Sequence, residues 1–241
     1  MKAVLLDIEG TTTPVEFVYQ VLFPYAREHA ADFLRQKQQQ PDVRADIEAL
    51  RKEHALDRAQ GSNPPDWRDE ETLLESVVAY VRWLMDRDRK STALKSLQGK
   101  IWQHGYSTGE LRSEVYSDVP RAFSRWRGQK RDIAIFSSGS TLAQRLLFAH
   151  TTAGDLTHFI REYFDTTTGK KTEAESYRRI SGLLGLSPLE ILFVSDTVAE
   201  LDAARLAGMK TALCVRPGRE RPPASGHPII ETFDELRPYE E

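Results

Sequence analysis

Cysteine is nearly absent from this sequence: Cys214 is the one cysteine among 241 residues. A framework of disulfide bonds is therefore excluded. Cys214 lies in an apolar run at residues 211–215, where a buried thiol of a β-strand is the expected role. Because proteins without disulfides are typical of reducing compartments, we expect a cytoplasmic protein.

Long hydrophobic runs and an excess of one charge are also missing. The sequence has no stretch of about 18 consecutive apolar residues, which argues against a membrane-spanning helix. Its first apolar run reaches Asp7 too early to belong to a signal peptide. The formal net charge is −3, so no basic field favours nucleic acid or an anionic membrane. We expect a monomer whose partner is a small molecule.

Short apolar runs that end in polar residues are what the sequence does contain. Three of them are each followed by residues with helical periodicity: 3–6, 133–136 and 191–194. A fourth run covers residues 211–215. Strands that alternate with helices predict an α/β fold, here a doubly wound, Rossmann-like parallel sheet with helices on both faces. Ligands of such sheets bind beyond the carboxyl ends of the strands, where the polar residues lie.

The pattern changes between residues 13 and 118, where long helical stretches such as 17–36 and 71–88 occur without a strand-like run. This change indicates an insertion after the first strand. We therefore predict an α/β core formed by residues 1–12 and 119–241, and an inserted helical cap formed by residues 13–118.

Two carboxylates, Asp7 and Glu9, stand two positions apart where the first strand ends. A carboxylate there can bind Mg²⁺ as a hard oxygen ligand and can attack phosphorus as a nucleophile. The second carboxylate can transfer a proton to or from the leaving oxygen. The structural alternative is that Asp7 caps the following helix and Glu9 is a solvated loop acid.

Further candidates lie later in the chain, most of them at the ends of predicted strands. Ser137 and Ser138 can offer hydroxyl and backbone N–H groups to a phosphate, although a helix cap explains them equally well. Lys171 can bind a phosphate oxygen, although paired lysines usually face solvent. Asp196 is a candidate Mg²⁺ ligand, and Glu200 follows it on the next helix. Together these residues supply the parts of a phosphatase that uses an aspartyl-phosphate.

At these positions the chain resembles the haloacid dehalogenase-like hydrolases, whose four motifs here would be Asp7-x-Glu9, Ser137, Lys171 and Asp196. More narrowly, six segments look like the enolase-phosphatases of methionine salvage: Asp7–Pro14, Leu22–Tyr25, Ala93–Gly99, Ser137–Ser140, Glu173–Tyr177 and Val215–Gly218. These segments extend along nearly the whole chain, and the resemblance therefore includes the cap.

The resemblance implies one Mg²⁺ per chain, held by Asp7, by Asp196 and by the backbone carbonyl of Glu9. Asp7 would also be the nucleophile. Glu9 stands where most phosphatases of the superfamily have an aspartate that acts as general acid. Its longer side chain leaves two roles open, which are proton transfer to the leaving group and enolisation.

The resemblance also implies that Ser137, Ser138 and Lys171 bind the substrate phosphate, with Lys171 taking part in catalysis. Glu200 would support these groups without touching the substrate. The implied substrate is 2,3-diketo-5-methylthiopentyl-1-phosphate, which is first enolised and then dephosphorylated. The products are 1,2-dihydroxy-3-keto-5-methylthiopentene, an acireductone, and phosphate. The sequence does not identify the base for enolisation.

Three alternatives remain open at this point. A general Mg²⁺-dependent phosphatase of the same superfamily would share every core motif and differ in the cap. A dehalogenase would use Asp7 to attack carbon, but it needs neither Glu9 nor a metal at Asp196. A non-enzymatic phospho-receiver domain also uses aspartate, lysine and Mg²⁺, but it has no large inserted cap.

Overall fold

A computed structural model describes residues 1–68, 72–221 and 226–239 of the chain. The chain forms two compact units. The first, which we call the sheet unit, consists of Met1–Val18 and Arg112–Glu241. The second, the helical unit, consists of Tyr19–Leu111. These residues fall within the range 13–118 that the sequence predicts for the insert.

In the part of the chain that the structure describes, the sheet unit is built on six parallel strands in the order β3-β2-β1-β4-β5-β6. Their bounds are Ala3–Leu6 (β1), Asp132–Phe136 (β2), Ile160–Phe164 (β3), Ile191–Ser195 (β4), Lys210–Cys214 (β5) and Ile229–Ile230 (β6). The doubly wound α/β fold is confirmed, and the four predicted strands are present with ends shifted by a residue at most. The strands β3 and β6 were not predicted.

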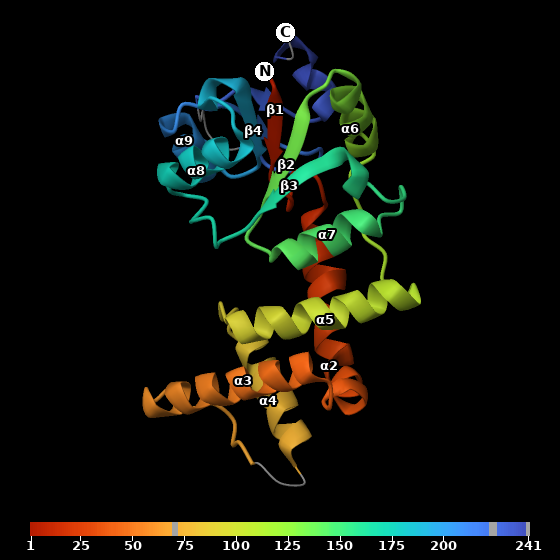
Figure 1. The fold of residues 1–241 in the computed structure, drawn as a ribbon, viewed down its shortest axis with the longest axis vertical. Coiled ribbons are helices and arrows are strands. Elements are labelled where there is room, and N and C mark those ends of the chain that lie inside the picture. The colour runs from red at the N-terminus through yellow and green to blue at the C-terminus, as the bar shows by residue number, and fades with distance from the viewer. Residues whose placement is uncertain (69–71, 222–225, 240–241) are drawn as a thin grey trace. The chain divides into compact units, whose positions relative to one another are not determined.

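Helices cover both faces of this sheet. They are α6 (Val119–Gly128), α7 (Thr141–Ala149), α8 (Ala174–Leu184) and α9 (Val198–Leu206). Figure 1 shows α8 and α9 together on one side of the sheet and α6 on the other. The side chains of Leu5 and Phe193 belong to the same buried cluster as Ile180 of α8 and Leu201 of α9. Alternate strand residues thus bury both faces, which is why these strands appear as nearly continuous apolar runs.

The helical unit contains α2 (Phe23–Lys37), α3 (Pro41–Ala59), α4 (Leu73–Asp86) and α5 (Thr92–Thr108). The helical stretch expected at 17–36 is present, and it consists of α1 (Val15–Phe17), a π-helical segment, η1 (Val18–Leu22), and α2. The start expected at residue 71 lies outside the described residues, and that helix is α4.

The described residues of the sheet unit also form the 3₁₀ helices η2 (Thr157–Phe159), η3 (Pro188–Glu190) and η4 (Phe233–Tyr239). Cys214 is buried at the end of β5, as the apolar run around it predicts. Within the described residues, every helix is too short or too polar to cross a membrane.

Candidate active site

Three of the predicted site residues directly follow neighbouring strands and lie at one edge of the sheet. The register aligns Leu6 of β1 with Ile135 of β2 and with Val194 of β4. The N–H of Asp7 continues this pairing and donates to the carbonyl of Val194 at 3.0 Å. Asp7, Ser137 and Asp196 therefore follow strand ends that lie level with one another, at the carboxyl edge where parallel sheets bind ligands.

A lysine and two acids meet at this edge. Lys171 Nζ lies 2.5 Å from Asp7 Oδ1 and 2.6 Å from Glu200 Oε2. Burial alone would lower the pKa of Lys171, but the charges of Asp7 and Glu200 raise it above its ordinary value. The hydroxyl of Ser195 donates to the same oxygen of Glu200 at 2.9 Å. Lys171 is therefore a charged group held between two carboxylates.

The loop after β1 turns tightly around the carbonyl of Ile8, which accepts N–H groups from Thr11, Thr12 and Thr13. Gly10 lies in this loop with φ +71°, in the left-handed region. A Cβ atom on Gly10 would lie 2.2 Å from Asp196 Oδ2. The glycine thus serves the turn and also leaves room for the carboxylate of Asp196 against the loop that follows Asp7.

Four acids share this edge with one lysine. Burial, followed by the charge of Asp7, raises the pKa of Glu9 to about 7. The same two causes raise the pKa values of Asp196 and Glu200 above the ordinary range, although Asp196 is exposed to solvent and Glu200 is half-buried. Since Lys171 offsets only part of this negative charge, the site favours an additional cation.

The acids at this edge include the kind of ligand that magnesium prefers. Within the described residues, no three acid, histidine or cysteine side chains converge on one point. Magnesium is usually held by one or two carboxylates, with the remaining positions filled by water or substrate phosphate. Asp7 and Asp196 provide two carboxylates of that kind.

The serine-rich loop after β2 contains both a helix cap and the predicted phosphate ligands. Ser140 Oγ accepts the N–H of Ala143 and caps α7, so the capping alternative holds for this serine. Ser137 is buried at the strand end, and its hydroxyl accepts the N–H of Gly139 at 3.2 Å. Ser138 is exposed. The buried amide of Gln144 donates to the carbonyl of Gly139 and ties the loop to β3.

Comparison with known proteins agrees with this architecture. The family model of the haloacid dehalogenase-like hydrolases matches residues 1–208. Enolase-phosphatase E1 of Synechococcus elongatus is 52% identical over 236 residues, covering 98% of each chain. Enolase-phosphatase E1 of Sorangium cellulosum is 49% identical over 237 residues, covering 98% of this chain and 97% of its own. The chain belongs to the enolase-phosphatase E1 family of haloacid dehalogenase-like hydrolases.

Solved structures carry the same fold. The crystal structure of the UTR4 protein from Saccharomyces cerevisiae is 34% identical to this chain, with a TM-score of 0.78 and coverage of 98% of this chain and 99% of its own. A dehalogenase with 18% identity and a TM-score of 0.55 shows the fold alone. As a member of the enolase-phosphatase E1 family the chain is an enzyme, and the phospho-receiver alternative is set aside.

In this member of the enolase-phosphatase E1 family, Arg216 holds the loop after β1 in place, a role that the sequence did not predict. Arg216 is 2% exposed, and its Nε donates to the carbonyl of Thr11 at 2.9 Å. Its Nη1 pairs with Asp118 Oδ2 at 2.8 Å, and its guanidinium carbon lies 4.2 Å from the ring centroid of Tyr116 and 4.6 Å from that of Phe233. Its position in the segment Val215–Gly218, directly after the predicted strand at 211–215, was the feature of the sequence that could have marked Arg216 as important.

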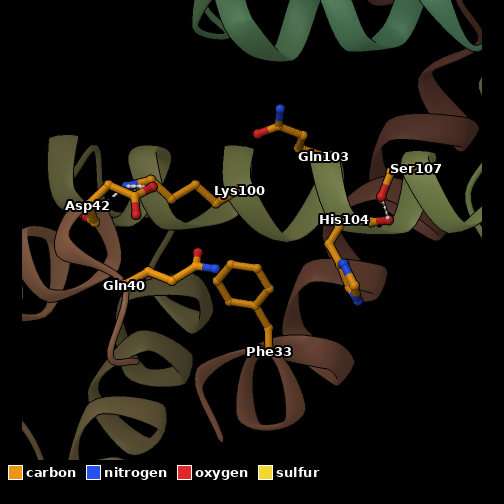
Figure 2. A pocket seen from close by; sticks show the side chains of 7 residues that line it. All are labelled: Phe33, Gln40, Asp42, Lys100, Gln103, His104 and Ser107. Carbon is orange, nitrogen blue, oxygen red and sulfur yellow. Dashed lines mark hydrogen bonds and ion pairs between the residues drawn. The ribbon is translucent and has the colours of Figure 1, made fainter. Parts of the chain in front are cut away.

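A pocket in the helical unit of the same protein contains none of the predicted site residues. Its volume is about 260 Å³, and Figure 2 shows Phe33 and His104 at one side and Lys100 with Asp42 at the other. Lys100 donates to the carbonyl of Asp42 at 3.0 Å and forms an ion pair with Asp46. Because Lys100 is already neutralised, it is a poor ligand for a substrate phosphate.

Proposed function

We propose that this chain is the enolase-phosphatase that converts 2,3-diketo-5-methylthiopentyl-1-phosphate into 1,2-dihydroxy-3-keto-5-methylthiopentene and phosphate in methionine salvage. The observation that carries the proposal is the buried contact of Asp7 with Lys171 at the carboxyl edge of the sheet. This contact occurs in a chain whose relatives over nearly their full length are named enolase-phosphatases.

In the phosphatase half-reaction Asp7 is the nucleophile. One carboxylate oxygen of Asp7 forms a bond to phosphorus while the bond from phosphorus to the substrate oxygen breaks. Glu9 supplies a proton to that oxygen, which its pKa of about 7 permits because a fraction of the group is protonated at neutral pH. Water then attacks phosphorus and gives a proton back to Glu9, while the bond from phosphorus to Asp7 breaks, so that phosphate is released and Asp7 is regenerated as a carboxylate.

Lys171 and the serines hold the phosphate in this proposal. Lys171 now pairs with Asp7 and Glu200, and it needs only to turn its ammonium toward an arriving phosphate oxygen to offset the incoming charge. Ser137 and Ser138 add hydroxyl groups from the next strand end. Glu200 keeps the ammonium close to Asp7 without contacting the substrate.

Magnesium is the proposed cofactor, with one ion per chain. Asp7, Asp196 and the backbone carbonyl of Glu9 would hold it, and the surplus of acids at this edge supports that assignment. When bound, the ion supplies positive charge for the phosphoryl oxygens and for the enolate of the first half-reaction. The cap boundary at residues 13–118, a monomeric state and a cytoplasmic location are further parts of the proposal.

A panel of phosphate esters tests the proposed substrate against the general phosphatase. We expect kcat/KM for the diketo phosphate to exceed the values for p-nitrophenyl phosphate and phosphoglycolate by at least about 100-fold, because a specific site uses contacts beyond the phosphate. Initial rates of phosphate release in saturating Mg²⁺ measure these ratios. Equal values across the panel would leave only a general phosphatase.

A further inference from the structure

Lys171 belongs to a loop that has little regular structure of its own. The loop extends from residue 165, after β3, to residue 173, before α8. Gly169 in this loop has φ +145°, and a Cβ atom there would lie 2.2 Å from Ser176 Oγ. The backbone of the loop therefore passes directly against the first turn of α8.

Three side chains of α8 donate hydrogen bonds to this loop. Ser176 Oγ donates to the carbonyl of Lys170 at 2.7 Å, and Arg179 Nη1 donates to the carbonyl of Thr168 at 2.6 Å. Between them, the hydroxyl of Tyr177 donates to the carbonyl of Lys171 at 2.6 Å. Of these three hydrogen bonds, the bond from Tyr177 is the one that is made to the backbone of Lys171.

Ring packing holds Tyr177 in addition to its hydrogen bond. Its side chain is fully buried, whereas Arg179 is exposed. Its ring packs against Phe136, the last residue of β2, with a centroid distance of 5.6 Å, and against Phe193 of β4 at 5.0 Å. Tyr177 is thus anchored on the two strands that lead to Ser137 and Asp196, and no part of the proposed chemistry uses its hydroxyl.

We propose that Tyr177 is a positioning residue for Lys171. Its hydroxyl fixes the backbone of Lys171 relative to β2 and β4, and this sets the point from which the flexible lysine side chain reaches Asp7 and Glu200. A lysine ammonium has no geometric preference of its own, so its placement depends on where its backbone is held. The catalytic consequence of this placement rests on the proposed function, whereas the placement itself does not.

Labelling of lysines with an acetylating reagent, followed by mass spectrometry, tests the placement. In the native protein the side chain of Lys171 is 11% exposed, and that of neighbouring Lys170 is 79% exposed. We expect Tyr177→Phe to speed the acetylation of Lys171 about three- to tenfold, as expected for the loss of one buried hydrogen bond, with the rate at Lys170 unchanged.

The matched control is Tyr163→Phe. Tyr163 lies on β3 in the same unit and is buried, but its hydroxyl has no hydrogen-bond partner within the described residues. This variant should leave the labelling of Lys171 and the rate of phosphate release unchanged. The thiol of buried Cys214 reports any general opening of the sheet unit, and its reaction with a thiol reagent should be equally slow in all three proteins.

Phosphate release provides the second measurement. Tyr177→Phe should lower kcat about tenfold with a smaller change in KM, because the transition state depends more on the placement of Lys171 than substrate binding does. Unchanged labelling of Lys171 in Tyr177→Phe, or equal increases at Lys171 and Cys214, would overturn the positioning role. A different outcome is faster labelling of Lys171 in Tyr177→Phe together with no phosphatase activity in the wild type. This outcome would contradict the proposed function and leave the positioning role intact.

Discussion

At the residue scale, Gly10 is a point at which the loop after Asp7 lies directly against the carboxylate of Asp196. Its positive φ suits glycine, and the 2.2 Å between a built Cβ and Asp196 Oδ2 leaves no space for a side chain. A small shift of the backbone could relieve the positive φ alone, and a small shift of a side chain could relieve the close contact alone. Together they mean that a larger residue must move Asp196, which we propose as a metal ligand.

We therefore expect Gly10→Ala to lower the Mg²⁺-dependent rate of phosphate release by at least about tenfold, because catalytic groups displaced by a fraction of an ångström lose much of their effect. The same assay on Gly182→Ala is the control. Gly182 lies in α8 with no atom near its would-be Cβ, so alanine there should leave the rate unchanged. Full activity of Gly10→Ala would show that phosphate release does not require the carboxylate of Asp196 at its position next to Gly10.

At the element scale, the exposure of each strand decided whether it could be predicted. The strands β1 and β4 are entirely buried and appear as apolar runs. The strand β3 lies at the edge of the sheet and has exposed Arg161 and Glu162, so its pattern lacks that signature. The sequence predicts a helical stretch across residues 17–36, but it does not predict that Val18–Leu22 within this stretch is π-helical.

The same limit applies to the site. Residue types at predicted strand ends made Asp7 and Asp196 candidates, whereas Lys171 follows the unpredicted strand β3 and was a candidate by its residue type and its order among the other motifs. The contacts of Lys171 with Asp7 and of Arg216 with Thr11 join residues far apart in the chain. Such contacts depend on loop conformations and strand register, which a single sequence does not specify.

Arg216 holds the element that follows β5 to the loop after β1, and its loss should be costly. Arg216→Met leaves Asp118 buried without its cation, and removal of one partner of a buried ion pair costs about 3–5 kcal/mol. The free energy of urea unfolding measures this change. The control Arg219→Met removes an exposed pair with Glu16 and should cost less than about 1 kcal/mol. Equal costs for the two variants would refute a bracing role for Arg216.

At the scale of the whole molecule, the sheet unit contains every predicted catalytic and metal-binding residue, and the helical unit contains none. The surplus of acids over lysine at the sheet edge makes the site suited to a divalent cation and a phosphate together. One set of groups can thus serve both half-reactions, because enolisation and phosphoryl transfer both develop negative charge on oxygen.

An assay of the diketo phosphate that follows enol absorbance and phosphate release together, with and without Mg²⁺, tests this account most directly. In the wild type, enol should appear first and phosphate should follow, and a chelator should abolish both signals. In Asp7→Asn, phosphate release should fall by at least about 10⁴-fold, because the nucleophile is lost. Phosphate release at the wild-type rate in Asp7→Asn, or no turnover of the diketo phosphate by the wild type, would contradict the account.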